Sequence, residues 1–257
     1  MRQRIIYYRD EVNDDFAGTN IKTKPLRENY RYIRESAVWK TASFVLYRVI
    51  AQPLVFLFVK TVYRQRFENK EVLKDAGGAG MYVYSNHTHK LLDAFLPSML
   101  RYRGRGYIIV GPDAMSIPGL KNIVQMLGAI PLGSTFTQSK EMLGCARTRI
   151  KQKNHVVIYP EAHIWPYYTE IRPFPPMSFG YPAHDGAPVY AMTNCYKKRR
   201  FVRLPKVVTY LDGPFFADSS LSLSDRREKL MEQCRCAMQK RAEENSDYQY
   251  VVYKKAQ

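Results

Sequence analysis

The chain has 257 residues, of which 46% are hydrophobic and 25% are charged. A chain of this length and composition is neither too small nor too polar to form a hydrophobic core, and it can form one large domain or two small ones. The formal net charge of +17 favours an anionic partner: a nucleic acid, an anionic lipid surface or a phosphorylated substrate. The 20 tyrosines and 12 phenylalanines are compatible with base stacking and with contact at a membrane interface.

The N-terminal residues, MRQRIIYYRDEVNDDF, are too polar for a secretory signal, so we expect a cytosolic environment and reduced cysteines. The four cysteines contain no CxxC pair, and the Cys234-Arg-Cys236 spacing is not a usual zinc pattern, so no metal site is predicted. The acidic stretch NDDFAG (13–18) lacks the spacing of a calcium loop and stays unassigned.

Residues 41–59, TASFVLYRVIAQPLVFLFV, form an apolar segment between Lys40 and Lys60. Arg48 and Pro53 lie inside it, and the uncharged run 49–59 is short for a membrane span, which needs about 20 apolar residues. Three alternatives stay open: a buried core helix, an interfacial or re-entrant helix, and a spanning helix. Cations and aromatic residues flank the run, which favours the interfacial helix.

After this segment the pattern alternates between strands and helices. Strands are predicted at 81–85, 106–111, 155–160, 188–193 and 206–211, with a short strand or turn at 129–133. Helices are predicted at 90–102, 118–127 and 139–153, and a last helix is predicted to begin near Ser224 as its N-cap. This order predicts an α/β fold with a mostly parallel sheet flanked by helices, preceded by the membrane-associated helical segment. We divide the chain into a polar segment (1–36), a membrane-associated segment (37–75), the α/β domain (76–245) and a C-terminal tail (246–257).

The stretch SNHTHKLLD (85–93) directly follows the strand predicted at 81–85. Sites in parallel α/β sheets form at the carboxyl ends of strands, where loops lead into helices. A histidine oriented by a carboxylate can activate a hydroxyl, because the carboxylate fixes the tautomer and stabilises the imidazolium. His87 is the first candidate for the base, and Asp93 is its orienting carboxylate. His89 is the competitor, because it lies four positions before Asp93 and could share one helix face with it.

Four segments in this order, SNH…DAF, SIPGLKNIVQMLGAIPLGS, VVIYPEAH and GAPVYAMT, resemble the lysophospholipid acyltransferase family, which includes the 1-acylglycerol-3-phosphate acyltransferases. The resemblance covers residues 80–240 and implies acyl transfer from an acyl thioester by a His/Asp general base, without a cofactor. His87 and Asp93 match the family's NHx4D pair in type, with five intervening residues in place of four. Asn86 precedes the histidine as in the family.

The other family motifs carry over in part. Gly128 and Ile130 are present in GAIPLGS, but Gly133 stands where the family has an arginine for the acceptor phosphate. Pro160 and Glu161 match in YPEAH, while Ala162 and His163 replace the family's glycine and threonine. The resemblance therefore assigns Asn86, Gly128, Pro160 and Glu161 to substrate binding. Arg172 is our candidate for the replacement phosphate ligand, with Lys140 as the alternative.

The expected function is acylation of a lysophospholipid or related glycerol lipid, with acyl-CoA or acyl carrier protein as donor, in phospholipid biosynthesis. The expected partners are these substrates and an anionic membrane surface, and the expected location is peripheral or shallowly inserted at the cytoplasmic face of the membrane. Two alternatives stay open. One is a non-catalytic protein that binds membrane or nucleic acid through basic clusters such as NCYKKRRFVR (194–203), although no nucleic-acid-binding signature is present. The other is a thioesterase, although the chain has no GxSxG motif.

Overall fold

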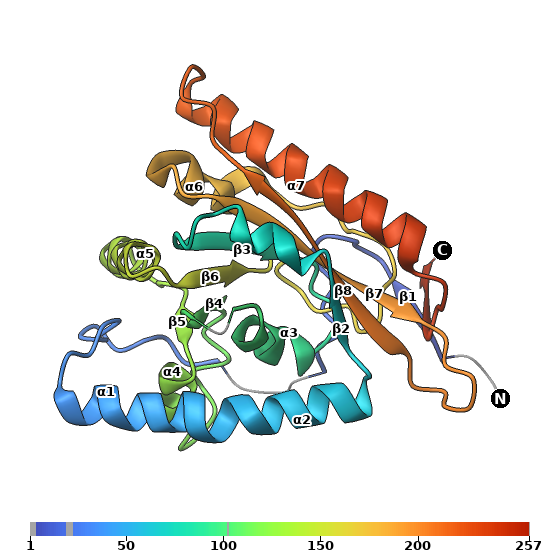
Figure 1. Ribbon diagram of the computed structural model, residues 1–257, viewed down its shortest axis with the longest axis horizontal. Coiled ribbons are helices and arrows are strands. Elements are labelled where there is room, and N and C mark those ends of the chain that lie inside the picture. The colour runs from blue at the N-terminus through green and yellow to red at the C-terminus, as the bar shows by residue number, and fades with distance from the viewer. Residues whose placement is uncertain (1–3, 19–22, 102, 257) are drawn as a thin grey trace.

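The computed structural model describes residues 4–18, 23–101 and 103–256. One sheet of seven strands, in the spatial order β2-β8-β7-β3-β6-β4-β5, runs through the molecule (Figure 1). Its strands are β2 (Arg66–Glu68), β3 (Met81–Ser85), β4 (Gly106–Val110), β5 (Ala129–Pro131), β6 (His155–Ile158), β7 (Val189–Lys197) and β8 (Lys206–Phe215). The pairings are parallel except for β7 with β8, so the predicted α/β fold with a mostly parallel sheet is confirmed.

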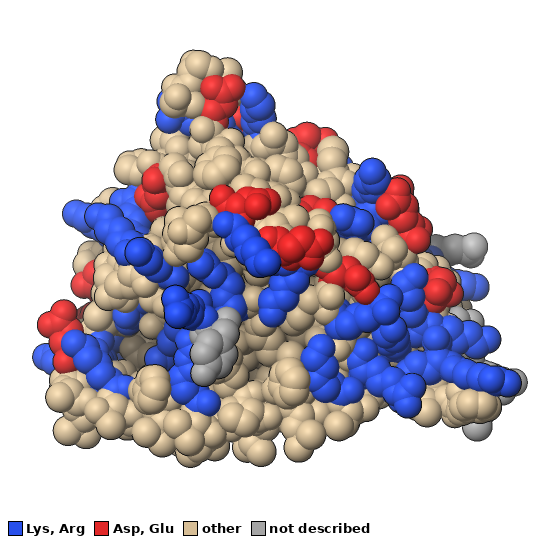
Figure 2. Space-filling view, in the orientation of Figure 1, with Lys and Arg blue, Asp and Glu red and all other residues tan. Residues whose placement is uncertain are grey.

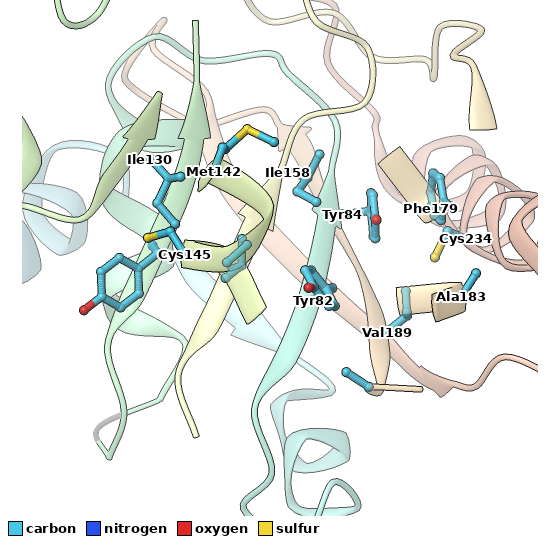
Figure 3. Close-up of a cluster of buried hydrophobic side chains, with 14 of the residues drawn as sticks. Tyr82, Tyr84, Ile130, Met142, Cys145, Ile158, Phe179, Ala183, Val189 and Cys234 are labelled. Carbon is cyan, nitrogen blue, oxygen red and sulfur yellow. The ribbon is translucent and has the colours of Figure 1, made fainter. Parts of the chain in front are cut away.

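Helices cover both faces of this sheet (Figure 1). They are α1 (Ala37–Phe44), α2 (Gln52–Val62), α3 (Leu92–Phe95), α4 (Lys121–Met126), α5 (Phe136–Lys151), α6 (Gly180–Asp185) and α7 (Leu223–Asn245), with the short turns η2 (Lys70–Lys74), η3 (Leu96–Met99) and η4 (Pro176–Phe179). β3 shows why both faces need cover, because all five of its residues are buried. Tyr82 and Tyr84 pack with residues of α5, α6 and α7 (Figure 3), while Met81 and Val83 pack on the opposite face.

The predicted helices differ from the structure in their bounds. The helix predicted at 118–127 is α4, which starts at Lys121, and the helix predicted at 139–153 is α5, which starts at Phe136. The helix predicted at 90–102 is short: α3 ends at Phe95 and continues as the 3₁₀ turn η3, since Pro97 supplies no N–H for an α-helical ladder. Residue 102 lies outside the described residues. The last helix starts at Leu223, because the hydroxyl of Ser222, rather than that of Ser224, accepts the N–H of Asp225.

The apolar segment forms one helical rod of 26 residues from Ala37 to Val62, in which a π-helical stretch, η1 (Val45–Ala51), joins α1 to α2. Pro53 explains the joint, because its missing N–H leaves the preceding turn without a regular i to i−4 bond. By length and composition alone, the rod could cross a membrane. Of its most apolar stretch of 18 residues, 22% is buried. It lies along one side of the molecule, which we call the base (Figure 1).

The four segments into which we divided the sequence are in contact with one another in the structure. β2, within 37–75, joins the main sheet by pairing with β8. Tyr30 and Tyr32, within 1–36, belong to the main core cluster. β1 (Arg4–Tyr8) and β9 (Val251–Lys255) pair in parallel, so residues near both ends of the described chain lie side by side. Neither β1, β9 nor β2 was predicted.

Candidate active site

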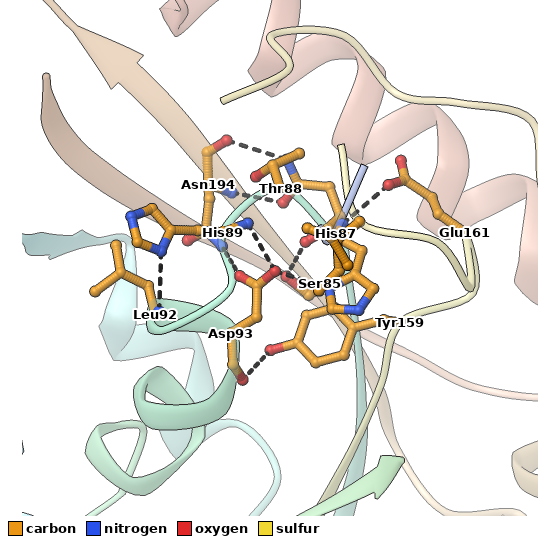
Figure 4. A network of polar contacts seen from close by, with 12 residues as sticks. Ser85, His87, Thr88, His89, Leu92, Asp93, Tyr159, Glu161 and Asn194 are labelled. Atoms are coloured by element: carbon orange, nitrogen blue, oxygen red, sulfur yellow. Dashed lines mark hydrogen bonds and ion pairs between the residues drawn. The ribbon is translucent and has the colours of Figure 1, made fainter. Parts of the chain in front are cut away.

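His87 and Asp93 meet at the carboxyl end of β3, the strand that lies between β6 and β7. His87 follows Ser85 and Asn86 directly after the strand, and Asp93 is in the first turn of α3. The Nδ1 atom of His87 lies 2.8 Å from Oδ2 of Asp93 (Figure 4). When Nδ1 carries the proton and donates it to this carboxylate, Nε2 is the unprotonated nitrogen of the ring, which is the arrangement of a general base.

The Asp93 carboxylate is buried and held in a fixed orientation. Its Oδ2 also accepts the backbone N–H of His89 at 2.9 Å, and its Oδ1 lies 3.4 Å from the donor Nδ2 of Asn194. The hydroxyl of Tyr159 donates to the backbone carbonyl of Asp93 at 2.5 Å, and the Tyr159 ring stacks on the His87 ring with centroids 4.4 Å apart. These contacts fix both the carboxylate and the imidazole plane.

His89 has a different role in the structure. Its Nδ1 accepts the backbone N–H groups of Leu91 and Leu92, at 3.3 and 3.1 Å, so the ring caps the start of α3. Burial lowers the pKa of His89, which favours the neutral ring that this acceptor role needs. The contact of His89 with Asp93 is through its backbone and not through its side chain. The side-chain pair is therefore His87 with Asp93.

Glu161 contacts the loop that carries His87. It follows β6, is 3% exposed, and its Oε2 accepts the backbone N–H of His87 at 2.9 Å. Burial raises the pKa of Glu161, against the opposing effect of the nearby Arg172 guanidinium. Glu161 therefore connects β6 to the loop that carries His87, which makes it a positioning residue in this geometry.

Arg172 is buried and does not line the cavity over His87. Its side chain is buried and ion-paired with Glu161 at 3.4 Å, and its backbone N–H donates to Oε1 of the same carboxylate at 3.1 Å. The guanidinium also donates to the backbone carbonyls of His163 and Glu11 and lies over the Trp165 ring. The expectation that Arg172 binds the acceptor phosphate is corrected on this geometry, because its donors face the protein interior.

Of the remaining predicted residues, one lines the cavity and two have structural roles outside it. Pro160 lines the cavity beside His87. Asn86 pairs its side-chain amide with the backbone of Asn194, at 2.9 and 3.1 Å, and so ties the catalytic loop to β7. Gly128 has φ +108° and lies where a Cβ would stand 2.5 Å from the Gly106 carbonyl, so it shapes the turn into β5 and does not line the cavity.

The absence of a side chain at position 133 also has a structural reason. A Cβ at this position would lie 2.4 Å from the backbone nitrogen of Ser139, at the start of α5. The chain therefore has no space for the arginine that the family carries here. The alternative cation, Lys140, is exposed on α5 and is not among the cavity-lining residues.

A cavity of about 740 Å³ opens over His87 and Asp93. Its walls are largely apolar, with Ile108, Ile109 and Val110 from β4 among them. Among the described lining residues Lys90 is the only lysine or arginine, while Asp15 and Asp113 are carboxylates that line the same cavity as His87 and Asp93. Sequence reasoning missed Lys90, which adjoins the catalytic motif, and it left the stretch containing Asp15 unassigned. Within the described part of the chain, no three His, Cys, Asp or Glu side chains are placed to hold a metal ion.

Residues 64–194 match the model of the acyltransferase family, and the chain belongs to this family. The fold is similar to the crystal structure of the 1-acyl-sn-glycerophosphate (LPA) acyltransferase PlsC from Thermotoga maritima, with a TM-score of 0.52 and 18% identity. That match covers 82% of this chain and 85% of the Thermotoga chain. A search of curated proteins gives no match. The resemblance seen in the sequence is thus confirmed at the level of the family and the fold, and the family supports acyltransferase activity.

Proposed function

We propose that the protein transfers a fatty acyl group from an acyl thioester to the hydroxyl of a lysophospholipid or related glycerol lipid. The observation that carries this proposal is the hydrogen-bonded pair of His87 and Asp93 in a cavity with mostly apolar walls. The cavity volume falls within the usual range of small-molecule sites, and apolar walls suit lipid substrates.

The mechanism follows from the orientation of the pair. Nε2 of His87 takes the proton from the acceptor hydroxyl while its oxygen attacks the thioester carbonyl, and Asp93 stabilises the imidazolium that forms. The tetrahedral intermediate then collapses, the C–S bond breaks, and the thiolate takes the proton from Nε2. The products are the ester and the free thiol. The donor is acyl-CoA or acyl carrier protein, and no covalent acyl-enzyme is formed.

Among its described lining residues, the cavity over His87 contains one lysine, Lys90, and no arginine, together with the carboxylates of Asp15 and Asp113. With Arg172 buried and Gly133 unable to carry a side chain, Lys90 is the described cation placed to contact an acceptor phosphate. We propose Lys90 for this role in place of Arg172.

The experiment is a screen of lysophospholipid and monoacylglycerol acceptors with both donor types, followed by thiol release and by the mass of the lipid product. Thiol release that requires the acceptor, and that is lost in His87→Ala, supports the proposal. Release without the acceptor would identify a thioesterase. If the folded protein releases no thiol with any donor and acceptor, the result would identify a non-catalytic binding protein.

We further propose that the rod 37–62 lies flat at the cytoplasmic membrane surface with its outer face inserted. The family and the rod both point to membrane association. Val55 and Val59 pack into the core, while Leu54 and Leu57 are 62% and 61% exposed. A helix that is tied to the protein along one face is better suited to lie on a bilayer than to cross it.

The variant Leu54→Glu/Leu57→Glu should bind vesicles about tenfold more weakly or worse, because each exposed leucine contributes apolar area. Phe216→Glu/Leu223→Glu is the matched control, since both residues are similarly exposed away from the rod. Equal binding by the two variants would contradict insertion of the rod. Deleting residues 1–65 is not a suitable test, because it removes buried core residues such as Tyr30 and Val59.

A further inference from the structure

A second cavity, of about 450 Å³, lies beside α1 and contains a concentration of positive charge. We call it the arginine cavity. Its lining includes Arg34, Lys40, Arg48, Arg105 and Arg149, and among its described lining residues the only carboxylate is Glu35. Figure 2 shows Lys and Arg side chains around a hollow on the side of the molecule where α1 and α5 lie, above the largely uncharged base.

Three of these arginines have only neutral partners within the described residues. Arg34 donates to Asn122, Arg105 donates to Ser43, and Arg149 donates to Gln152. Each of the three also has a buried Nε for which the described protein provides no hydrogen-bond acceptor.

Burial lowers the pKa of Arg105, and the neighbouring guanidiniums of Arg149 and Arg48 lower it further. Buried charges are normally paired with an opposite charge, and Arg34, Arg105 and Arg149 form no ion pair with a described carboxylate, so an external anion would stabilise these three guanidiniums. Guanidiniums bind phosphate and carboxylate groups through two parallel N–H···O bonds.

The arginine cavity is separate from the catalytic cavity. The two share no lining residue. They lie toward opposite ends of β4, since Arg105 lines the first and Val110 the second. Five residues of extended strand place these two positions about 16 Å apart. An anion in the arginine cavity is therefore not the reacting group of a substrate bound at His87.

The position of the arginine cavity indicates the source of the anion. Trp39, Lys40 and Phe44 of α1 line it, and α1 belongs to the rod whose outer face is apolar. Phe44 is 59% exposed and Val38 is 82% exposed, so the cavity adjoins the surface proposed to enter the bilayer. A lipid phosphate lies at the level of a flat interfacial helix.

We propose that the arginine cavity binds the phosphate of an anionic membrane lipid and so fixes the α1 end of the rod at the membrane surface. This inference rests on the proposed membrane docking and not on acyl transfer. A volume of about 450 Å³ allows a phosphate together with its glycerol substituent.

The first test measures binding to vesicles of phosphatidylcholine with and without phosphatidylglycerol. The variant Arg105→Gln/Arg149→Gln is compared with Arg64→Gln/Arg200→Gln, which removes the same charge from exposed positions near the other end of the rod. We expect the cavity variant to lose about tenfold more affinity for anionic vesicles than the control, because charge-assisted bonds add to general attraction. Equal losses would mean surface electrostatics alone and would overturn the proposal.

The second test distinguishes a lipid from a soluble phosphate. Glycerol 3-phosphate, at constant ionic strength, should raise the melting temperature of the wild type and not that of the cavity variant. If it does so while both variants bind vesicles equally, the site takes a soluble phosphate and the lipid source is wrong. If Arg105→Gln/Arg149→Gln does not fold, Arg34→Gln/Lys40→Gln replaces it in both tests. Acyl transfer to a detergent-dispersed acceptor should be unchanged in the cavity variants, which separates this proposal from the proposed function.

Discussion

The replacement Asp93→Asn tests the catalytic pair with little change of shape. Oδ2 of Asp93 accepts both Nδ1–H of His87 and the backbone N–H of His89. An asparagine has one acceptor oxygen at this position. If the amide oxygen takes the Oδ1 position, where it can accept Nδ2–H of Asn194, the NH₂ occupies the Oδ2 position, faces His87 and makes Nδ1 an acceptor. The ring proton then lies on Nε2, the nitrogen that must take the proton of the acceptor hydroxyl.

The size of the effect follows from the lost charge. A unit pair separated by roughly 4 Å at an effective dielectric constant of about 20 interacts by about 4 kcal/mol. The imidazolium formed in the transition state loses this stabilisation, which corresponds to about a 10³-fold decrease in kcat. We expect His87→Ala to lose about 10²-fold or more, as for a missing general base.

The assay is acceptor-dependent thiol release with the best donor and acceptor from the screen, together with a melting curve for each variant. His89→Ala is the control: it removes the cap of α3 and should cost about 1 kcal/mol of stability with a much smaller loss of turnover. Activity of Asp93→Asn within threefold of the wild type would refute the role of the carboxylate. A dead His89→Ala beside an active His87→Ala would show that the wrong histidine was assigned.

Three further predictions concern other positions. Lys90→Ala should raise the KM for a phosphate-bearing acceptor about fivefold, as for one exposed charge pair worth about 1 kcal/mol, and should leave the KM for an uncharged monoacylglycerol unchanged; equal effects on both acceptors would argue against a phosphate contact. Arg172→Met should lower the free energy of unfolding by about 3 kcal/mol or more, because it leaves Glu161 buried and unpaired; a stable variant with only a raised acceptor KM would restore the phosphate role. Burial lowers the pKa of His155 to about 4, so the unfolded chain binds a proton first and stability should fall by about 3 kcal/mol as the pH falls from 6.5 to 4. The fall over this pH range should be smaller by about this amount in His155→Gln, and urea unfolding of both proteins at several pH values measures the difference.

The main sheet was predictable because buried parallel strands are continuously apolar. Runs such as YIIV (107–110) and VVIY (156–159) mark β4 and β6 without reference to their partners. β2 has only three residues and no such run, whereas β1 and β9 contain the apolar runs IIYY (5–8) and VVY (251–253), which give no local sign of the partner they pair with. β1 and β9 form only because the two ends of the described chain meet, which depends on the tertiary fold.

The α/β class, the family resemblance and the two groups, His87 and Asp93, that form the pair could all be predicted from the sequence. It also placed them where a strand leads into a helix. Which histidine contacts Asp93 through its side chain depends on the tertiary structure. Because α3 begins after His89, the His89 side chain caps this helix, and the side chain of His87 is the one that contacts Asp93.

The burial and the partners of the other charged residues could not be predicted from the sequence, because they depend on the tertiary fold. Arg172 is one of 40 Lys and Arg residues, and nothing local marks it as buried against Glu161 and Trp165. The arginine cavity likewise combines residues from α1, α5 and the start of β4. Apolar periodicity is a local property that a sequence displays directly, whereas the burial and pairing of a charge depend on contacts between segments far apart in the chain.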